Sequence, residues 1–312
     1  MGQSLTRPGV RVARRARKAP ARARRFGYIL IAPLLVWLLA TIAAPLAYSV
    51  YLSFTDAGTI GTPFEFIGLD NYSNVLGEAE FWSAFLRSIA WAVGGALLQT
   101  IMAFGAALVL HQAFRGRRFA RTWIVLSWIV PTIVIAILWR WMLNASFGVV
   151  NYVLTESGLA GEPVDFLGDP SLALPTVVFV NAWRWFPFLP LIILAGLAAI
   201  PRELYDAARV DGATSLQIFR SITLPLLQPV MYVVGLLGTL WSFNVFDVIW
   251  LLTQGGPSNT TETLPVLVYQ RAFDGFAMGE ASTISVLLAL FLLVFSLAYM
   301  RFVPHGETRE VF

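Results

Sequence analysis

Residues 201–229 read PRELYDAARVDGATSLQIFRSITLPLLQP and separate two long apolar stretches of the chain. The segment carries three basic and three acidic side chains, so its charges balance. Residues 203–210 favour a short helix, because most of them are good helix formers. Gly212 can supply the positive φ that ends this helix, and Thr214 or Ser215 can cap a second one. The small apolar face of the first helix suits either a groove in a soluble partner or the membrane surface.

The rest of the chain consists mainly of apolar stretches. Of its 312 residues, 57% are hydrophobic and 13% are charged, against about 45–50% and about 25% in soluble proteins. This composition excludes soluble, disordered and disulfide-stapled proteins, and the lack of cysteine excludes a thiolate metal site. A bilayer core about 30 Å thick needs about 20 mostly apolar residues in a helix. We expect six transmembrane helices, at about 28–54, 85–110, 122–143, 172–200, 226–252 and 281–303.

The positive charges predict which side of the membrane each loop faces. The net charge is +4, yet residues 1–25 hold nine Lys or Arg residues and no Asp or Glu. With the N-terminus in the cytoplasm, 18 of the 22 Lys and Arg residues fall in inner segments, as the positive-inside rule requires. The two longest outer loops are then acidic. We therefore expect both termini to be cytoplasmic.

The start of the chain has two interpretations. Arg24 and Arg25 precede an apolar run, which also fits a twin-arginine secretory signal. The run is too long for a signal core and five more expected spans follow it, so we interpret it as a retained first anchor. We divide the chain into a basic cytoplasmic tail (1–25), a first transmembrane helix with its outer loop (26–80), a transmembrane core (81–303) that contains the cytoplasmic segment 201–225, and a cytoplasmic C-terminal tail (304–312).

A spaced pattern within residues 201–229 resembles the signature of the permease subunits of bacterial ABC importers. That signature is an acidic residue and two alanines, three positions, glycine, nine positions, and then Ile-x-Leu-Pro. Asp206 stands where the family usually has Glu, which shortens the reach of an ion pair to a partner. The fuller carbohydrate-type pattern adds Asp211, Ala213, Phe219 and Pro229, all of which are present. The core pattern is met at every spacing by Asp206, Ala207, Ala208, Gly212, Ile222, Leu224 and Pro225.

The resemblance implies an all-α polytopic protein with the type I ABC importer permease fold, in the bacterial plasma (inner) membrane. In that family this loop is the coupling helix, which sits in a cleft of a cytoplasmic ABC ATPase dimer. A second permease and an extracytoplasmic solute-binding protein are the other implied partners, besides membrane lipids, and no nucleic acid is expected. We expect no cofactor on this chain, which has no phosphate-binding Gly-x-x-x-x-Gly-Lys-Ser/Thr loop, so ATP and Mg²⁺ are left to the ATPase. The coupling residues implied are Asp206, Ala207, Ala208, Asp211, Gly212, Ile222, Leu224 and Pro225.

Two outer-loop stretches narrow the resemblance to carbohydrate importers. They are FIGLDNY at 66–72, followed by Phe81 and Trp82, and LTQGGPSN at 252–259, followed by TETL at 261–264. Both resemble the first permease of maltose- or glycerol-3-phosphate-type pairs. We therefore expect import of a di- or oligosaccharide, or of a sugar- or glycerol-phosphate-like solute, by alternating access. The alternative is a permease for a non-sugar solute such as a peptide or amino acid, which would share the coupling loop but not these stretches.

Polar residues inside the expected spans are candidates for the solute cavity, since such groups are costly in a membrane. Tryptophans there are candidates for stacking on sugar faces. Arg184 and Asp247 fall at similar depth in neighbouring spans, so they either pair with each other or contact the solute. Ser242 and Trp183 are further candidates. No residues suggest a nucleophile with its base or a metal site, so we assign no catalytic residue and expect a transport subunit, not an enzyme. The candidate cavity residues are Gln99, Asn181, Arg184, Trp241, Asn244 and Asp247.

Overall fold

The computed structural model describes residues 21–302 apart from 60, 62 and 113. Most of the expected basic tail and all of the expected C-terminal tail (304–312) lie outside the described residues. The chain divides into two compact units, Met1–Tyr48 and Ser49–Phe312.

The described part of the first unit is a long apolar helix. It consists of α1 (Ala21–Leu38), the wide turn η1 (Leu39–Ala43) and the beginning of α2 (Ala44–Leu52). The wide turn comes just before Pro45, whose ring removes a backbone N–H and crowds the preceding turn. A π-type turn accommodates such a proline without ending the helix. Residues Leu30–Leu52 are long and apolar enough to cross a membrane, which confirms the expected helix near 28–54.

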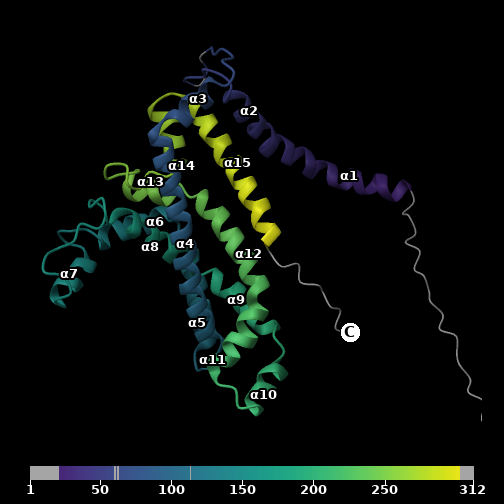
Figure 1. Ribbon diagram of the computed structural model, residues 1–312, viewed down its shortest axis with the longest axis vertical. Coiled ribbons are helices and arrows are strands. Elements are labelled where there is room, and N and C mark those ends of the chain that lie inside the picture. The colour runs from purple at the N-terminus through teal and green to yellow at the C-terminus, as the bar shows by residue number, and fades with distance from the viewer. Residues whose placement is uncertain (1–20, 60, 62, 113, 303–312) are drawn as a thin grey trace, which may run out of the picture. The chain divides into compact units, whose positions relative to one another are not determined.

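The second unit is a bundle of helices, in which the longest connections are 53–69 before α3 and 157–172 before α8 (Figure 1). Within its described residues the only β pairing is an isolated bridge between Thr55 and Phe66. Its elements, in chain order, are α3 (Asp70–Gly77), α4 (Ala79–His111), α5 (Arg117–Trp128), α6 (Thr132–Met142), α7 (Val149–Glu156), α8 (Ala173–Trp185), α9 (Leu189–Ala199), α10 (Arg202–Val210), α11 (Ser215–Ile218), η2 (Phe219–Thr223), α12 (Leu224–Phe243), α13 (Asp247–Thr253), α14 (Leu264–Tyr269), η3 (Gln270–Asp274) and α15 (Met278–Phe302).

The helix α4 organises this unit, because it contacts α8, α9, α12 and α14. Its Ala103 and Ala107 are fully buried against α9 and α12, in a core that includes Ile193 and Leu227. Small residues let helices approach closely, which is how helices associate in a membrane where water does not drive them together. The helix α12 lies beside α4 in Figure 1.

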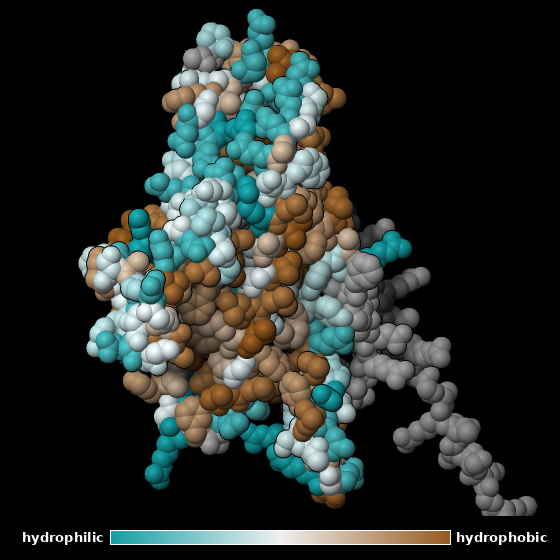
Figure 2. Space-filling view, turned by 60° about the vertical axis from the view of Figure 1, so that its left-hand side comes forward, coloured by the Kyte–Doolittle hydropathy of each residue, from teal (hydrophilic) through white to brown (hydrophobic). Residues whose placement is uncertain are grey.

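The surface of the molecule carries many large apolar side chains. Figure 2 shows hydrophobic residues gathered over the middle of one face and hydrophilic residues toward both of its ends. Among the exposed apolar residues are Leu97 and Ile101 on α4 and Leu293 and Val294 on α15. Exposed apolar area of this extent suits contact with lipid rather than with water.

The described residues contain four helices that are long and apolar enough to span a membrane, or five if the bent pair α8–α9 is one span. The continuous helix expected at 122–143 is wrong. The chain breaks between α5 and α6 at Pro131, which has ψ 142° and cannot continue a helix. The continuous helix expected at 226–252 is also wrong, because α12 ends at Phe243 and α13 begins at Asp247.

The expected span at 172–200 is bent rather than straight. The helices α8 and α9 meet at 53°, and the turn between them contains Pro187. A second proline, Pro190, lies in the first turn of α9, where its missing N–H costs no helical hydrogen bond. The bend places the end of α8 and the beginning of α9 around one small space, described below.

The sequence FIGLDNY has a structural role in the first outer loop. The amide of Asn71, at the start of α3, donates to the carbonyl oxygens of Ser53 (3.1 Å) and Thr55 (2.7 Å). The hydroxyl of Thr283 on α15 also donates to the Ser53 carbonyl, at 3.2 Å. Gly279 lies so close that a Cβ there would be 2.2 Å from the carbonyl oxygen of Thr55. These buried contacts hold the loop against the beginning of α15.

Candidate functional site

The segment after α9 forms the short helix α10, which has a well-defined end. The N–H of Gly212 donates to the carbonyl of Arg209 at 3.1 Å, and the N–H of Ala213 donates to that of Ala208 at 2.9 Å. This pair of bonds is the Schellman arrangement, which needs a left-handed residue directly after the helix. Gly212 has φ +76°, as its position in the sequence predicted.

The next helix begins at a capping box. The backbone N–H of Thr214 donates to Oε1 of Gln217 at 2.7 Å, and the N–H of Gln217 donates to Oγ1 of Thr214 at 3.4 Å. Of the two caps considered in the sequence, the structure uses Thr214. The helix then continues through α11, the wide turn η2 and α12, so one helix runs from Ser215 to Phe243. The wide turn precedes Pro225, as η1 precedes Pro45.

One side of helix α10 is exposed, and the other side packs against the core. Tyr205 packs against the core, and its hydroxyl lies 3.2 Å from Oγ1 of Thr223. Leu204 and Val210 are exposed, the latter by 87%. The carboxylate of Asp206 pairs with Arg209 at 3.2 Å, with both side chains about 70% exposed. An exposed pair of this kind contributes little stability, so Asp206 can exchange its partner at small cost.

Four of the eight expected coupling residues line one hollow of about 320 Å³ between α10 and the following helix. They are Ala208, Asp211, Gly212 and Ile222. The other four pattern residues are exposed, with Asp206 and Ala207 on α10 and Leu224 and Pro225 at the beginning of α12.

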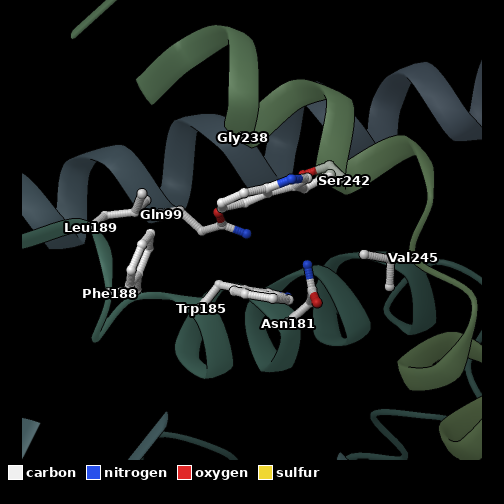
Figure 3. A pocket seen from close by; sticks show the side chains of 9 residues that line it. Gln99, Asn181, Trp185, Phe188, Leu189, Gly238, Ser242 and Val245 are labelled. Carbon is white, nitrogen blue, oxygen red and sulfur yellow. The ribbon is translucent and has the colours of Figure 1, made fainter. Parts of the chain in front are cut away.

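Three of the six candidate cavity residues lie together in a second pocket, shown in Figure 3. Gln99 comes from α4, Asn181 from α8 and Trp241 from α12. The rings of Trp185 and Trp241 lie with centroids 5.9 Å apart and planes inclined by 30°. The free space is about 10 Å³, about what one water molecule needs. The remaining lining residues are Phe188, Leu189, Gly238, Ser242 and Val245.

Asn181 is the least satisfied polar group of this pocket. Its side chain is 1% exposed, and neither its amide nitrogen nor its amide oxygen has a hydrogen-bond partner among the described residues. Figure 3 shows the side chains of Asn181 and Gln99 pointing into the same space. An unpaired buried polar group costs about 1–3 kcal/mol, so a ligand that pairs with this amide would recover that free energy.

The other candidates lie outside the pocket. Arg184 on α8 pairs with Asp247 on α13 at 3.1 Å, so the pairing considered in the sequence is present. The Arg184 guanidinium also lies 5.1 Å from the ring centroid of Trp185. Asn244, at the end of α12, is exposed and donates to the carbonyl of Leu240 at 2.8 Å. Trp183 packs edge-on against Trp139.

Two ion-pair sites that the sequence did not indicate join distant segments near the first turns of α4. The guanidinium of Arg87 lies 2.7 Å from the carboxylate of Glu262, whose side chain is 2% exposed. Burial raises the pKa of Glu262, although the positive charge of Arg87 opposes this shift. Arg271 contacts three carboxylates, those of Glu78, Glu80 and Glu280.

Comparison with known proteins decides the family. The model of the family described as binding-protein-dependent transport system inner membrane component matches residues 99–309. The chain belongs to this family. It is therefore a multi-pass inner membrane permease of a binding-protein-dependent transport system.

Related permeases are similar over almost their whole length. The trehalose/maltose permease protein MalF of Thermococcus litoralis is 37% identical over 91% of this chain and 95% of its own. The trehalose permease protein SugA of Mycobacterium tuberculosis is 31% identical over 91% of this chain and 92% of its own. A solved bacterial ABC transporter involved in alginate import has a chain that matches with a TM-score of 0.78 at 24% identity, covering 90% of this chain and 95% of that one. This permease therefore has the fold of ABC importer permeases.

The permease pocket contains residues that the sequence did not single out, chiefly Trp185 and Phe188. Trp185 lies four positions after Asn181 on α8, which puts both on one helix face. That spacing could have identified Trp185. Phe188 lies beyond the break in the helix, where spacing along one helix no longer applies.

Proposed function

We propose that this permease imports a carbohydrate, most simply a neutral di- or oligosaccharide, by alternating access. The observation that carries the proposal is the unpaired amide of Asn181, which shares one pocket with Gln99, Trp185 and Trp241. Amides pair with sugar hydroxyls, and aromatic faces stack on the apolar faces of sugar rings. The relatives named for trehalose and maltose, at 31–37% identity, support the same class of solute.

The pocket also favours a sugar over the peptide or amino-acid alternative. None of its lining residues is charged. A free amino acid carries a carboxylate and an ammonium group, and both need charged or strongly polar partners when removed from water. The nearby guanidinium of Arg184 is already paired with Asp247.

For the topology we propose six spans with both termini in the cytoplasm. Four are the helices at Leu30–Leu52, Ala79–His111, Ser215–Phe243 and Met278–Arg301. The bent pair α8–α9 supplies a fifth, and α5 with α6, broken at Pro131, supplies the sixth. Irregular backbone is tolerated at membrane depth where it is buried in protein or lines a cavity, which fits the bend beside the pocket.

For the partners we propose that α10 and the hollow beside it contact a cytoplasmic ATPase, which binds the ATP and Mg²⁺. The exposed Leu204 and Val210 and the exchangeable Asp206 support this contact. A second permease would complete the cavity and a binding protein would deliver the solute. Shifting a two-state equilibrium from 1:99 to 99:1 takes about 5.5 kcal/mol of differential binding, which closure of the ATPase on ATP can supply.

The test is uptake of labelled trehalose or maltose by the assembled transporter carrying Asn181→Ala. We expect the apparent KM for the sugar to rise by about five- to tenfold, from the loss of one hydrogen bond worth about 1–1.4 kcal/mol. Asn244→Ala removes the same group outside the pocket and serves as the matched control. Unchanged uptake by Asn181→Ala, with assembly intact, would contradict the proposed sugar site.

A further inference from the structure

Four arginines gather where the chain enters α5. Arg115, Arg117, Arg118 and Arg121, together with Phe114 and Gly116, line a hollow of about 670 Å³. In the described part of the chain, none of these arginines pairs with a carboxylate. The hollow therefore concentrates positive charge that attracts an anion.

The end of the preceding helix fixes two of these arginines. Arg117 donates to the carbonyl of His111 at 3.3 Å, and Arg121 donates to the carbonyl of Leu110 at 3.2 Å. Both bonds satisfy carbonyl groups at the end of α4. The Nε of Arg121 is buried and has no hydrogen-bond partner among the described residues, so the cluster retains a donor that needs an acceptor. Arg115 and Arg118 are exposed.

The exposed face of α5 changes from charged to apolar along its length. Exposed residues recur at helical spacing from Arg118, through Phe119 and Trp123, to Leu126. The rings of Phe119 and Trp123 stack with centroids 5.7 Å apart and planes inclined by 23°. The opposite side of α5 packs against the core of α4, α9 and α12. The order of cation, aromatic ring and aliphatic chain matches the order of phosphate, interface and acyl chain in a lipid.

We propose that the arginine cluster and the exposed face of α5 bind one anionic phospholipid, with its phosphate at the arginines and its acyl chains along Phe119, Trp123 and Leu126. The apolar half of the site commits it to a lipid, because a lipid contacts the exposed Phe119 and Leu126 as well as the arginines, whereas a free phosphate ion contacts the arginines alone. Assignment to the cytoplasmic leaflet rests on the orientation proposed above, whereas lipid binding itself does not.

The test compares the full-length permease with the double variant Arg115→Gln/Arg118→Gln. Each protein is reconstituted in bilayer discs of equal phosphatidylglycerol and phosphatidylcholine, and native mass spectrometry counts the lipids that stay bound. We expect the preference for phosphatidylglycerol to fall about 30-fold, since each arginine near an anionic surface contributes about 1 kcal/mol. Neither exposed side chain pairs with a carboxylate, so the fold should persist. Arg140→Gln/Arg301→Gln removes the same charge elsewhere and should retain the lipid.

Two further arms separate a lipid from a free anion. Phe119→Ser should weaken retention of phosphatidylglycerol with all four arginines present, and excess inorganic phosphate should not release the lipid. Release by phosphate, or unchanged lipid retention in either the double arginine variant or Phe119→Ser, would overturn the proposal. Protease accessibility of the loop before α5 in sealed vesicles reports the orientation separately, so an error in topology is distinguishable from an error in lipid binding.

Discussion

The carboxylate of Glu262 lies 2.7 Å from the guanidinium of Arg87, although 175 positions separate the two residues. Arg87 also donates through Nε to the backbone carbonyl of Glu262 at 2.9 Å. Two positions further on, the N–H of Leu264 donates to the hydroxyl of Ser88 at 2.8 Å. These contacts fix the segment before α14 against the first turns of α4.

Removing Arg87 should therefore destabilise the permease strongly. We expect Arg87→Leu to lower the free energy of unfolding by about 3–5 kcal/mol, because it leaves the buried carboxylate of Glu262 without its partner. The measurement is the thermal midpoint of the purified protein in detergent. The double variant Arg87→Leu/Glu262→Leu removes both charges and should recover most of the loss. A single variant as stable as the wild type would show that this ion pair contributes little.

The same carboxylate should make stability depend on pH. Burial raises the pKa of Glu262 above its ordinary value of 4.5, despite the opposing charge of Arg87. The folded state then binds the proton more tightly than the unfolded state, so the contribution of Glu262 to stability is fully present below about pH 4.5 and is lost as the pH rises through the folded pKa. Compared with Glu262→Gln, the thermal midpoint of the wild type should fall between acidic and neutral pH. If the thermal midpoints of the wild type and of Glu262→Gln changed equally with pH, this prediction would be wrong.

Substitutions at Gly212 should show whether the turn after α10 acts through its backbone conformation or through direct contact with the ATPase. A Cβ at Gly212 would meet no atom within 4 Å, so space inside the chain does not restrict the residue. Its φ of +76° does restrict the residue. An ordinary side chain in this left-handed conformation costs about 1–2 kcal/mol, and Asn costs less. We expect Gly212→Val to abolish co-purification with the ATPase and sugar uptake. Gly212→Asn should keep the helical end yet weaken the contact.

Sugar uptake by the two Gly212 variants distinguishes these roles. Full uptake by Gly212→Asn with loss in Gly212→Val would mean that only the backbone conformation matters. Full uptake by both would contradict the coupling role of this turn. Circular dichroism of each purified variant provides the control for folding.

Local features of this permease were predictable from the sequence because they depend on neighbouring residues. The left-handed Gly212, a helix cap at Thr214 or Ser215 and the long helices near 85–110 and 281–303 each follow from the residues within a few turns. The pairing of Arg184 with Asp247 could be considered because both lie at similar depth.

Other features depend on contacts that spacing does not reveal. Pro131 breaks its helix whereas Pro225 follows a wide turn and stays within one, and the difference lies in how the surrounding turns can adjust. The sequence FIGLDNY indicated a family resemblance, but its reason, the bonds of Asn71 to the Ser53 and Thr55 carbonyls, required the tertiary structure. The ion pair of Arg87 with Glu262 joins segments that no local pattern connects.

The contact between the first outer loop and α15 gives a further prediction at Gly279. Its backbone N–H donates to the carbonyl of Ala57 at 2.9 Å, and a Cβ would lie 2.2 Å from the carbonyl oxygen of Thr55. Backbone atoms cannot rotate away as a side chain can, so Gly279→Ala must push the loop off the helix. We expect a loss of about 1–3 kcal/mol or more in stability, as for other overpacked sites.

The displaced loop should also become accessible, so limited proteolysis within residues 53–72 should accelerate in Gly279→Ala. Asn71→Leu, which removes the two bonds to the same loop without adding a clash, should give the same cleavage pattern. Gly105→Ala on α4 is the matched control, because a Cβ there would meet nothing within 4 Å. If cleavage and thermal midpoint are unchanged in both Gly279→Ala and Asn71→Leu, then these contacts do not hold the loop, and the FIGLDNY sequence must serve another purpose.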